Sequence, residues 1–203
     1  MLIMEREMAD TVCTRLGAVV MARHRPGAEL AHVKGAFDEK WIGSLPLPTK
    51  DRAPSQTVAL VDETTGSQRE VDEVAVEAAY AQRPRTQILE SIHSRSDGWP
   101  SLVALHLARL LRHRVLCSLF ESRAGDLTLG PHVDDWDGVI LQIQGAKGWR
   151  LWPEPHSPSR DVVTRAGDVL LLPRGVKHEV TTPEHSVHLL FAVTSEPFAA
   201  LSA

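Results

Sequence analysis

The second half of the chain is a succession of short apolar runs divided by glycine and proline, and no helical period separates them. The runs predict strands at residues 115–120, 139–144, 149–152, 169–172, 179–182 and 186–193. So many strands with no helix between them indicate a closed or double-sheet all-β core. The fold class that we expect is therefore mainly β.

Mixed patterns precede this region. They predict an amphipathic helix over residues 99–113 and two hairpin strands over residues 56–62 and 68–71. Residues 74–81 are rich in alanine, valine and glutamate in a pattern typical of a helix. Pro100 lies near the first turn of the amphipathic helix, where proline is favoured. We expect residues 1–113 to be a helical and mixed part that packs on the outside of a β core formed by residues 114–203, in one structural domain.

Composition limits the classes of function. The 203 residues are 43% hydrophobic, which is enough for a full core, and 22 basic against 26 acidic residues give a net charge of −4. A chain with a net negative charge lacks the overall positive potential typical of nucleic-acid-binding proteins, so no nucleic-acid partner is expected. Cys13 and Cys117 form no CxxC pair, and neither a thiolate zinc site nor a disulfide framework is indicated.

The N-terminal segment does not read as a targeting signal. Its apolar stretch at residues 16–22 is preceded by acidic residues, where a signal peptide is positive. No stretch reaches the roughly 18 apolar residues of a membrane span. We expect a cytoplasmic protein without a membrane partner, and several early methionines leave the true start open.

Two histidines and an aspartate have the spacing of a metal site. His132 and Asp134 are two apart on an expected strand, so their side chains point the same way. His178, 44 residues after Asp134, lies near a later strand and can close a three-ligand face. Two histidines and one carboxylate are the ligand set of non-haem Fe(II) oxygenases. Asp135 is expected to point the opposite way.

Three segments carry a resemblance to a known family. They are PHVDDWDGVILQIQGAKGWRLW at residues 131–152, RAGDVLLLPRGVKHEV at residues 165–180, and SVHLLFAV at residues 186–193. Together they resemble the JmjC/cupin-type Fe(II)/2-oxoglutarate oxygenases, and are similar to the bacterial ribosomal-oxygenase-like proteins. Upstream, FDEKW at residues 37–41 resembles a further family motif, so the resemblance extends over most of the chain.

The resemblance implies a double-stranded β-helix, also called a jelly roll, with Fe(II) held by His132, Asp134 and His178. It further implies that Lys147 pairs with the distal carboxylate of 2-oxoglutarate, where an ammonium offsets the desolvation of a buried anion. The cofactors implied are Fe(II), 2-oxoglutarate and O₂. The activity implied is hydroxylation of an unactivated C–H bond.

The cosubstrate site departs from the family pattern on one strand. Where the family commonly has Asn and Tyr, this chain has Ser118 and Phe120, and a phenylalanine cannot donate a hydrogen bond. Ser118 or Ser122 are the candidates to replace that donor. Three further residues are candidates to line the cavity: Trp136, Gln142 and His188.

The chain also differs from the family in extent. The ribosomal-oxygenase-like proteins carry a helical dimerisation region and a winged-helix domain after the β core, and here only residues 194–203 follow the last expected strand. Substrate and oligomeric state therefore stay open, the substrate being a peptide or protein side chain, an amino acid or a small biosynthetic intermediate. The alternatives are a cupin-like metalloenzyme that does not use 2-oxoglutarate, and a non-catalytic metal- or small-molecule-binding cupin.

Overall fold

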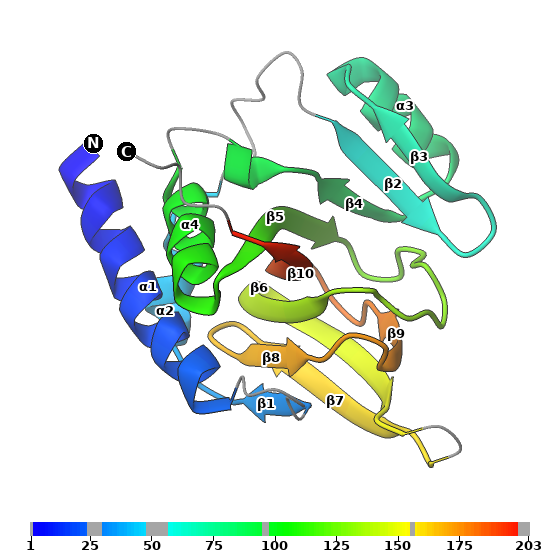
Figure 1. Ribbon diagram of the computed structural model, residues 1–203. Coiled ribbons are helices and arrows are strands. Elements are labelled where there is room, and N and C mark those ends of the chain that lie inside the picture. Colours follow the sequence, from blue (N-terminus) through cyan, green and yellow to red (C-terminus); the bar gives the residue numbers. More distant parts are fainter. Residues whose placement is uncertain (1, 24–29, 48–56, 95–97, 155–156, 199–203) are drawn as a thin grey trace.

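The fold was examined in a computed structural model, which describes residues 2–23, 30–47, 57–94, 98–154 and 157–198 (Figure 1). The helices are α1 (Leu2–Arg23), α2 (Glu39–Gly43), α3 (Glu73–Gln82) and α4 (Trp99–Leu111), with a 3₁₀ turn at Ile92–Ser94. The strands are β1 (Ala31–Val33), β2 (Val58–Asp62), β3 (Gly66–Glu70), β4 (Thr86–Leu89), β5 (His113–Ser122), β6 (Asp137–Trp152), β7 (Arg160–Arg165), β8 (Val169–Leu172), β9 (Lys177–Thr181) and β10 (Ser186–Pro197). The mainly β fold with N-terminal helices is confirmed.

Strand β6 organises the β core. It is 16 residues long, and every strand that pairs with it is antiparallel. Its first half pairs with β8 and β10, and its second half pairs with β7 and β9. One strand therefore contributes to both layers, which is the arrangement expected of a double-stranded β-helix.

The bend in β6 corrects a prediction. Residues 139–144 and 149–152 were expected to be two strands, because Gly145 and Gly148 read as strand breakers, and the structure shows one continuous strand. A register shift against β10 lies beside residues 142–144, and Gly145 has a φ of +61°. Bulges and left-handed glycines bend a strand without ending it. The glycines therefore carry β6 from one layer to the other.

Gly145→Ala is expected to destabilise the protein by about 3 kcal/mol, since a methyl group there meets both a left-handed backbone penalty and a steric clash. The added Cβ would overlap the carbonyl oxygen of His185. Gly35→Ala is the matched control, because Gly35 has a φ of +58° and open space around its Cβ position. Urea unfolding should show a loss of only about 1 kcal/mol for the control. Equal losses in the two variants would contradict the clash.

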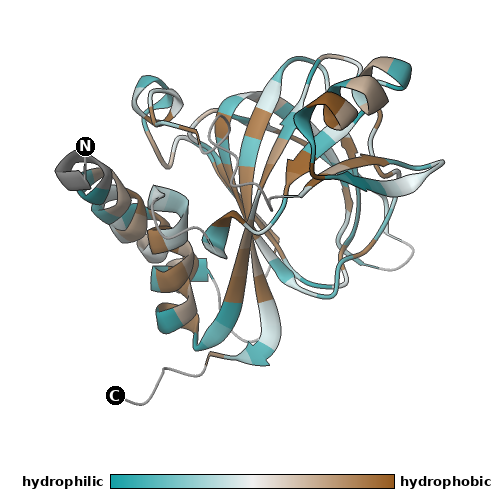
Figure 2. Cartoon of the chain, turned by 90° about the horizontal axis from the view of Figure 1, so that it is seen from above, coloured by the Kyte–Doolittle hydropathy of each residue, from teal (hydrophilic) through white to brown (hydrophobic). Residues whose placement is uncertain are grey.

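Helices α1 and α4 cover one side of the β core, and α3 packs on the β2–β3 hairpin. Figure 1 shows α1 beside α4 and α4 beside β5, and Figure 2 shows that hydrophobic and hydrophilic residues alternate along the strands. Helix α1 buries Val12, Leu16 and Val20 in the main core, at helical spacing. This helix was not predicted as such, although its apolar period is readable. None of the helices in the described segments is long and apolar enough to cross a membrane.

Helix α4 agrees with the predicted amphipathic helix, but ends two residues earlier. Arg112 follows it with a left-handed φ of 61°, and β5 begins at His113. The buried stripe is Trp99, Val103 and Leu107, whereas the apolar side chains of Leu102 and Leu105 are exposed. Contact with α1 and β5 decides which face of α4 is buried. The apolar period of the sequence alone does not distinguish the buried leucines from the exposed ones beside them.

Residues before 114 also contribute strands. Strand β1 pairs with β8, and β4 pairs with β5 and continues through β2 to β3, so the sheet runs in the order β1-β8-β6-β10-β5-β4-β2-β3. The hairpin β2–β3 agrees with the predicted hairpin. Strand β7 was not predicted, since only Val162 and Thr164 of its residues are buried and its polar flanks hide the alternation. The division at residue 114 stays a prediction.

Candidate metal centre

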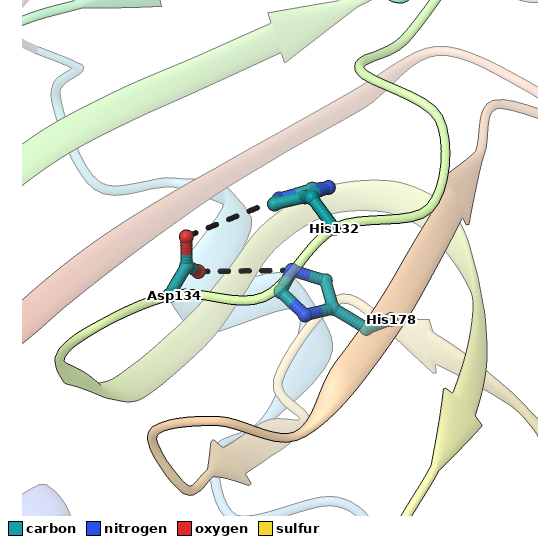
Figure 3. A group of neighbouring side chains, drawn as sticks. All are labelled: His132, Asp134 and His178. Atoms are coloured by element: carbon teal, nitrogen blue, oxygen red, sulfur yellow. Dashed lines mark ion pairs between the residues drawn. The ribbon is translucent and has the colours of Figure 1, made fainter.

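Three predicted ligands meet at one point. His132 and Asp134 lie on the connection between β5 and β6, and His178 lies on β9 (Figure 3). One ligand atom from each lies within 4.8 Å of the others. The Asp134 carboxylate is 4.0 Å from His132 Nε2 through one oxygen and 3.7 Å from His178 Nε2 through the other. This spacing can hold a single metal ion on one face.

The reason why the ligands face one another differs from the prediction. His132 and Asp134 were expected on one regular strand, but the segment is irregular, with an isolated antiparallel bridge between His132 and His178. Each of these two residues donates its N–H to the other's carbonyl, at 2.9 Å. Asp134 is held separately, since its carbonyl accepts from Gly175 N at 2.9 Å. Asp135 is exposed and outside the cluster.

Both imidazoles are oriented by the backbone. His132 Nδ1 donates to Gly130 O at 2.8 Å, and His178 Nδ1 donates to Val176 O at 3.0 Å. A carbonyl can only accept, so the proton lies on Nδ1 and the lone pair on Nε2. Metal-binding histidines are commonly fixed in this way by a carbonyl behind them. Both Nε2 atoms are therefore available to a metal, on the side of Asp134.

Burial makes the cluster costly without a cation. Burial raises the pKa of the Asp134 carboxyl above its ordinary value, although the neighbouring imidazoles His178 and His132 oppose the rise. Burial also lowers the pKa of His178. A divalent cation would stabilise the ionised carboxylate and needs neutral imidazoles. The donor set of two nitrogens and one carboxylate fits Fe(II) with open positions.

The N-terminal part supports the ligand segment. Glu63, at the β2–β3 turn, donates its N–H to Thr128 O at 2.9 Å, and Thr86 N donates to Leu127 O at 2.9 Å. The side chain of Glu63 also lies against Gly130, where an added Cβ would clash with it. These contacts hold the chain just before His132. The sequence predicted the hairpin itself. It did not predict that the hairpin lies against the segment before His132, because that contact joins residues far apart in the chain.

Lys147 is a buried cation inside the barrel. Its side chain points to the same face of β6 as Trp149, and the residue is 1% exposed. The ammonium donates to Ser122 Oγ at 2.7 Å and to Thr182 Oγ1 at 2.9 Å. Within the described residues no carboxylate oxygen lies within ion-pair distance of it. Burial lowers the pKa of Lys147 to about 8, against the opposing charge of Asp126.

Of the three candidates on β5, Ser122 contacts Lys147, whereas Phe120 contacts His188. Residues 118, 120 and 122 point to the same side of β5, opposite to the helices. Ser122 contacts Lys147 and also shares a hydrogen bond of 2.9 Å with Thr86. Ser118 is half-buried, and Phe120 stacks on His188 with ring centroids 4.8 Å apart. Thr182 and Thr86 were not singled out from the sequence, because their proximity to Lys147 depends on strand pairing.

The three cavity candidates have different surroundings. Gln142 is fully buried, and its amide donates to Ser186 Oγ and to Gln144 O, both at 2.9 Å. Its carbonyl accepts from Thr164 Oγ1 at 3.0 Å, so Gln142 secures the bend of β6. Trp136 is half-buried beside the metal ligands, and His188 is buried.

Trp149 lies within aromatic-contact distance of both parts of the site. Its ring centroid is 6.3 Å from that of His178 and 5.8 Å from that of His188. Its indole N–H donates to Thr164 Oγ1 at 2.9 Å. The same tryptophan therefore contacts a metal-ligand candidate and the aromatic pair near Lys147. The metal face and the buried ammonium share one interior.

Comparison with known proteins identifies the second half of the chain. Residues 101–201 match the JmjC domain family. Ribosomal oxygenase 2 of Rattus norvegicus is 36% identical over 90 residues, covering 36% of this chain and 19% of that protein. The bifunctional lysine-specific demethylase and histidyl-hydroxylase NO66 of Drosophila mojavensis is 36% identical over 84 residues, covering 31% of this chain and 10% of that protein.

Solved structures show the same fold. The Escherichia coli ribosomal oxygenase YcfD, in complex with cobalt and 2-oxoglutarate, has a TM-score of 0.61 and 18% identity, covering 88% of this chain and 51% of that one. Another crystal structure of YcfD has a TM-score of 0.65. This chain spans about half of YcfD and much less of the curated relatives. The family match over residues 101–201, together with the jelly-roll fold, shows that this chain belongs to the JmjC domain family.

Proposed function

We propose that this protein is an Fe(II)- and 2-oxoglutarate-dependent oxygenase that hydroxylates an unactivated C–H bond. The observation that carries the proposal is a metal-binding face and a buried ammonium in one barrel interior, joined by Trp149. Among the described residues, the Lys147 ammonium donates to two neutral hydroxyls, and a buried cation without an anionic partner is costly. A dicarboxylate that also chelates a metal satisfies both features.

Each group has a defined task in this proposal. His132, Asp134 and His178 would hold Fe(II), and the bound iron with 2-oxoglutarate and O₂ would supply the oxidising chemistry, with succinate and CO₂ as co-products. Lys147 binds the distal carboxylate through a charge-assisted hydrogen bond. Ser122 and Thr182 orient the ammonium, and Trp149 excludes water between the two ends. Three protein ligands would leave positions on the metal open for the cosubstrate and O₂.

For the substrate class we favour a side chain of a peptide or protein over an amino acid or a small biosynthetic intermediate. The metal ligands are accessible, since the side chains of His132 and Asp134 are 30% and 21% exposed. Val133 between them is 58% exposed, so an exposed apolar side chain adjoins the two ligands. The names of the relatives, a ribosomal oxygenase and a lysine demethylase and histidyl-hydroxylase, agree with a protein substrate.

Anaerobic titration of the Fe(II) protein with 2-oxoglutarate tests the function. We expect a visible charge-transfer band to appear, because the keto acid chelates the iron, and succinate to form once O₂ and a substrate are supplied. Glutarate is the matched control ligand, since it has both carboxylates but no keto group. It should compete for the site and give no band.

Absence of the band at saturating 2-oxoglutarate, with Fe(II) bound, would contradict the proposal. That result would favour a metalloenzyme that does not use 2-oxoglutarate, or a non-catalytic metal-binding protein. Iron content measured on the same sample separates failure to bind metal from failure to bind the keto acid.

A further inference from the structure

Thr128 joins two parts of the molecule, on the segment that leads to His132. Its hydroxyl donates to Val180 O of β9 at 2.9 Å. Its backbone carbonyl accepts from Glu63 N, at the β2–β3 turn, also at 2.9 Å. One half-buried residue therefore contacts both the strand that carries His178 and the hairpin of the N-terminal part.

The segment before His132 runs antiparallel beside β9 and makes few backbone hydrogen bonds to it. His132 and His178 exchange two, each at 2.9 Å, and Gly125 N donates to Thr182 O at 3.0 Å. Among the described residues, no backbone hydrogen bond joins the two segments between these points. The hydroxyl of Thr128 lies in this interval, so a side chain supplies the contact that a regular ladder would make.

The position of this segment decides how the two imidazoles face each other. The ring centroids of His132 and His178 are 4.2 Å apart. His132 Nδ1 donates to Gly130 O, two residues after Thr128, so the orientation of the ring depends on that carbonyl. Gly130 has a left-handed φ of +43°, and the side chain of Glu63 lies against it. A shift of Thr128 away from β9 would therefore displace Gly130 and the His132 ring.

We infer that Thr128 is a positioning residue of the metal centre, whose hydroxyl bond to β9 sets the spacing between His132 and His178. This inference rests on the proposed function and deepens it. Distances at a metal site hold to about 0.2 Å, so a small shift of one ligand weakens binding. Removal of a group that orients a ligand from behind raises the metal Kd roughly 10- to 100-fold. Thr128 acts through Gly130 rather than on a ligand directly, and we expect the lower end of that range.

Thr128→Val tests the inference, because it keeps the shape of the side chain and removes the hydroxyl. The Kd for Mn(II), measured by calorimetry, should rise about 10-fold. Thr128→Ser retains a hydroxyl and should restore most of the affinity. Thr194→Val is the matched control, since the Thr194 hydroxyl also donates to a backbone carbonyl, Arg114 O at 3.1 Å. That bond joins β10 to β5, which carry none of the three ligands, and its loss should leave the Kd unchanged.

Hydrogen exchange on the metal-free protein separates positioning from general stability. The backbone N–H groups of His132 and His178 form the bridge, and a local opening of the segment would expose both without global unfolding. In Thr128→Val these two amides should exchange severalfold faster than in the wild type, while the amides of α4 keep their rates. In Thr194→Val the two bridge amides should exchange as in the wild type.

Unchanged Mn(II) affinity in Thr128→Val would overturn the inference and leave the proposed function standing. Equal losses of affinity in Thr128→Val and Thr194→Val would overturn it too, because the hydroxyl would then act through stability alone. Failure of the wild type to bind Mn(II) would instead overturn both the inference and the proposed function. If Thr128→Val does not fold, Thr128→Ala removes the same hydroxyl without placing a methyl group against Val180 O, and the same outcomes decide.

Discussion

Asp134→Ala is expected to abolish metal-dependent turnover of 2-oxoglutarate, lowering succinate formation on the order of a thousandfold or more, because the bound metal supplies the reactive centre. The variant leaves only the two imidazoles, and no anionic ligand remains within 4.8 Å of them in the described site. Calorimetry with Mn(II) should show the loss of binding directly. The metal-free variant should unfold at the same temperature or higher, since burial already disfavours the ionised Asp134 carboxyl.

Asp135→Ala provides the matched control. Asp135 is the adjacent carboxylate, is exposed, and lies outside the ligand cluster. Its removal should leave Mn(II) affinity and succinate formation within about twofold of the wild type, as for most surface changes. Retained coupled turnover in Asp134→Ala would exclude the proposed metal centre, and so would equal losses in the two variants.

Lys147→Met is expected to have two opposite effects. Affinity for 2-oxoglutarate should fall at least about a hundredfold, because the distal carboxylate loses its charged partner while remaining buried. The ligand-free protein should become more stable by up to about 3 kcal/mol at pH 7, since each pKa unit of displacement corresponds to about 1.4 kcal/mol. The displacement runs from the ordinary 10.5 to about 8. Lost hydrogen bonds to Ser122 and Thr182 reduce the gain.

The pH dependence follows from the direction of that displacement. Between pH 8 and 10.5 the unfolded chain holds the Lys147 proton and the folded chain has released it, so this residue makes wild-type stability rise with pH across that window. The advantage of Lys147→Met should therefore be full below pH 8 and vanish above 10.5. The Kd of the wild type for 2-oxoglutarate should rise about tenfold per pH unit above 8, because binding then requires proton uptake.

Lys177→Met is the control for loss of a lysine charge. Lys177 is exposed on β9, with its ammonium 5.1 Å from the centroid of the Trp152 ring. Its replacement should change stability by less than about 1 kcal/mol and leave cosubstrate affinity intact. Unfolding by urea and titration with N-oxalylglycine, an inert analogue of 2-oxoglutarate, measure all these quantities at pH 7 and pH 9. A destabilised Lys147→Met that still binds the analogue would contradict the assigned role.

Local sequence determined much of the fold. Helix α3 follows the predicted density of apolar residues, and its first turn is capped by Asp72, whose carboxylate accepts from Ala75 N. Strand β8 coincides with the predicted run. These elements are specified by neighbouring residues. Strand β7 and the face of α4 were missed or misassigned, because packing partners distant in sequence decide which of their side chains are buried.

The candidate site divides in the same way. The identities of His132, Asp134 and His178 are readable from residue type and spacing, because few side chains bind metals and their intervals are characteristic. The way in which the three side chains converge cannot be read from the sequence, because it depends on a bridge between His132 and His178 rather than on one regular strand. The burial of Lys147 among Ser122 and Thr182 likewise requires three segments to pair in one register.

The sequence by itself therefore determined the chemistry available to this protein: a metal-ligand set, a basic residue at a fixed interval, and a β core to carry them. Only the tertiary structure decided that Lys147 is a buried cation without a carboxylate at ion-pair distance in the described segments, and that His188 stacks on Phe120. The physical reason is that burial and strand register are properties of segments about 25 to 70 residues apart, and no local pattern contains them.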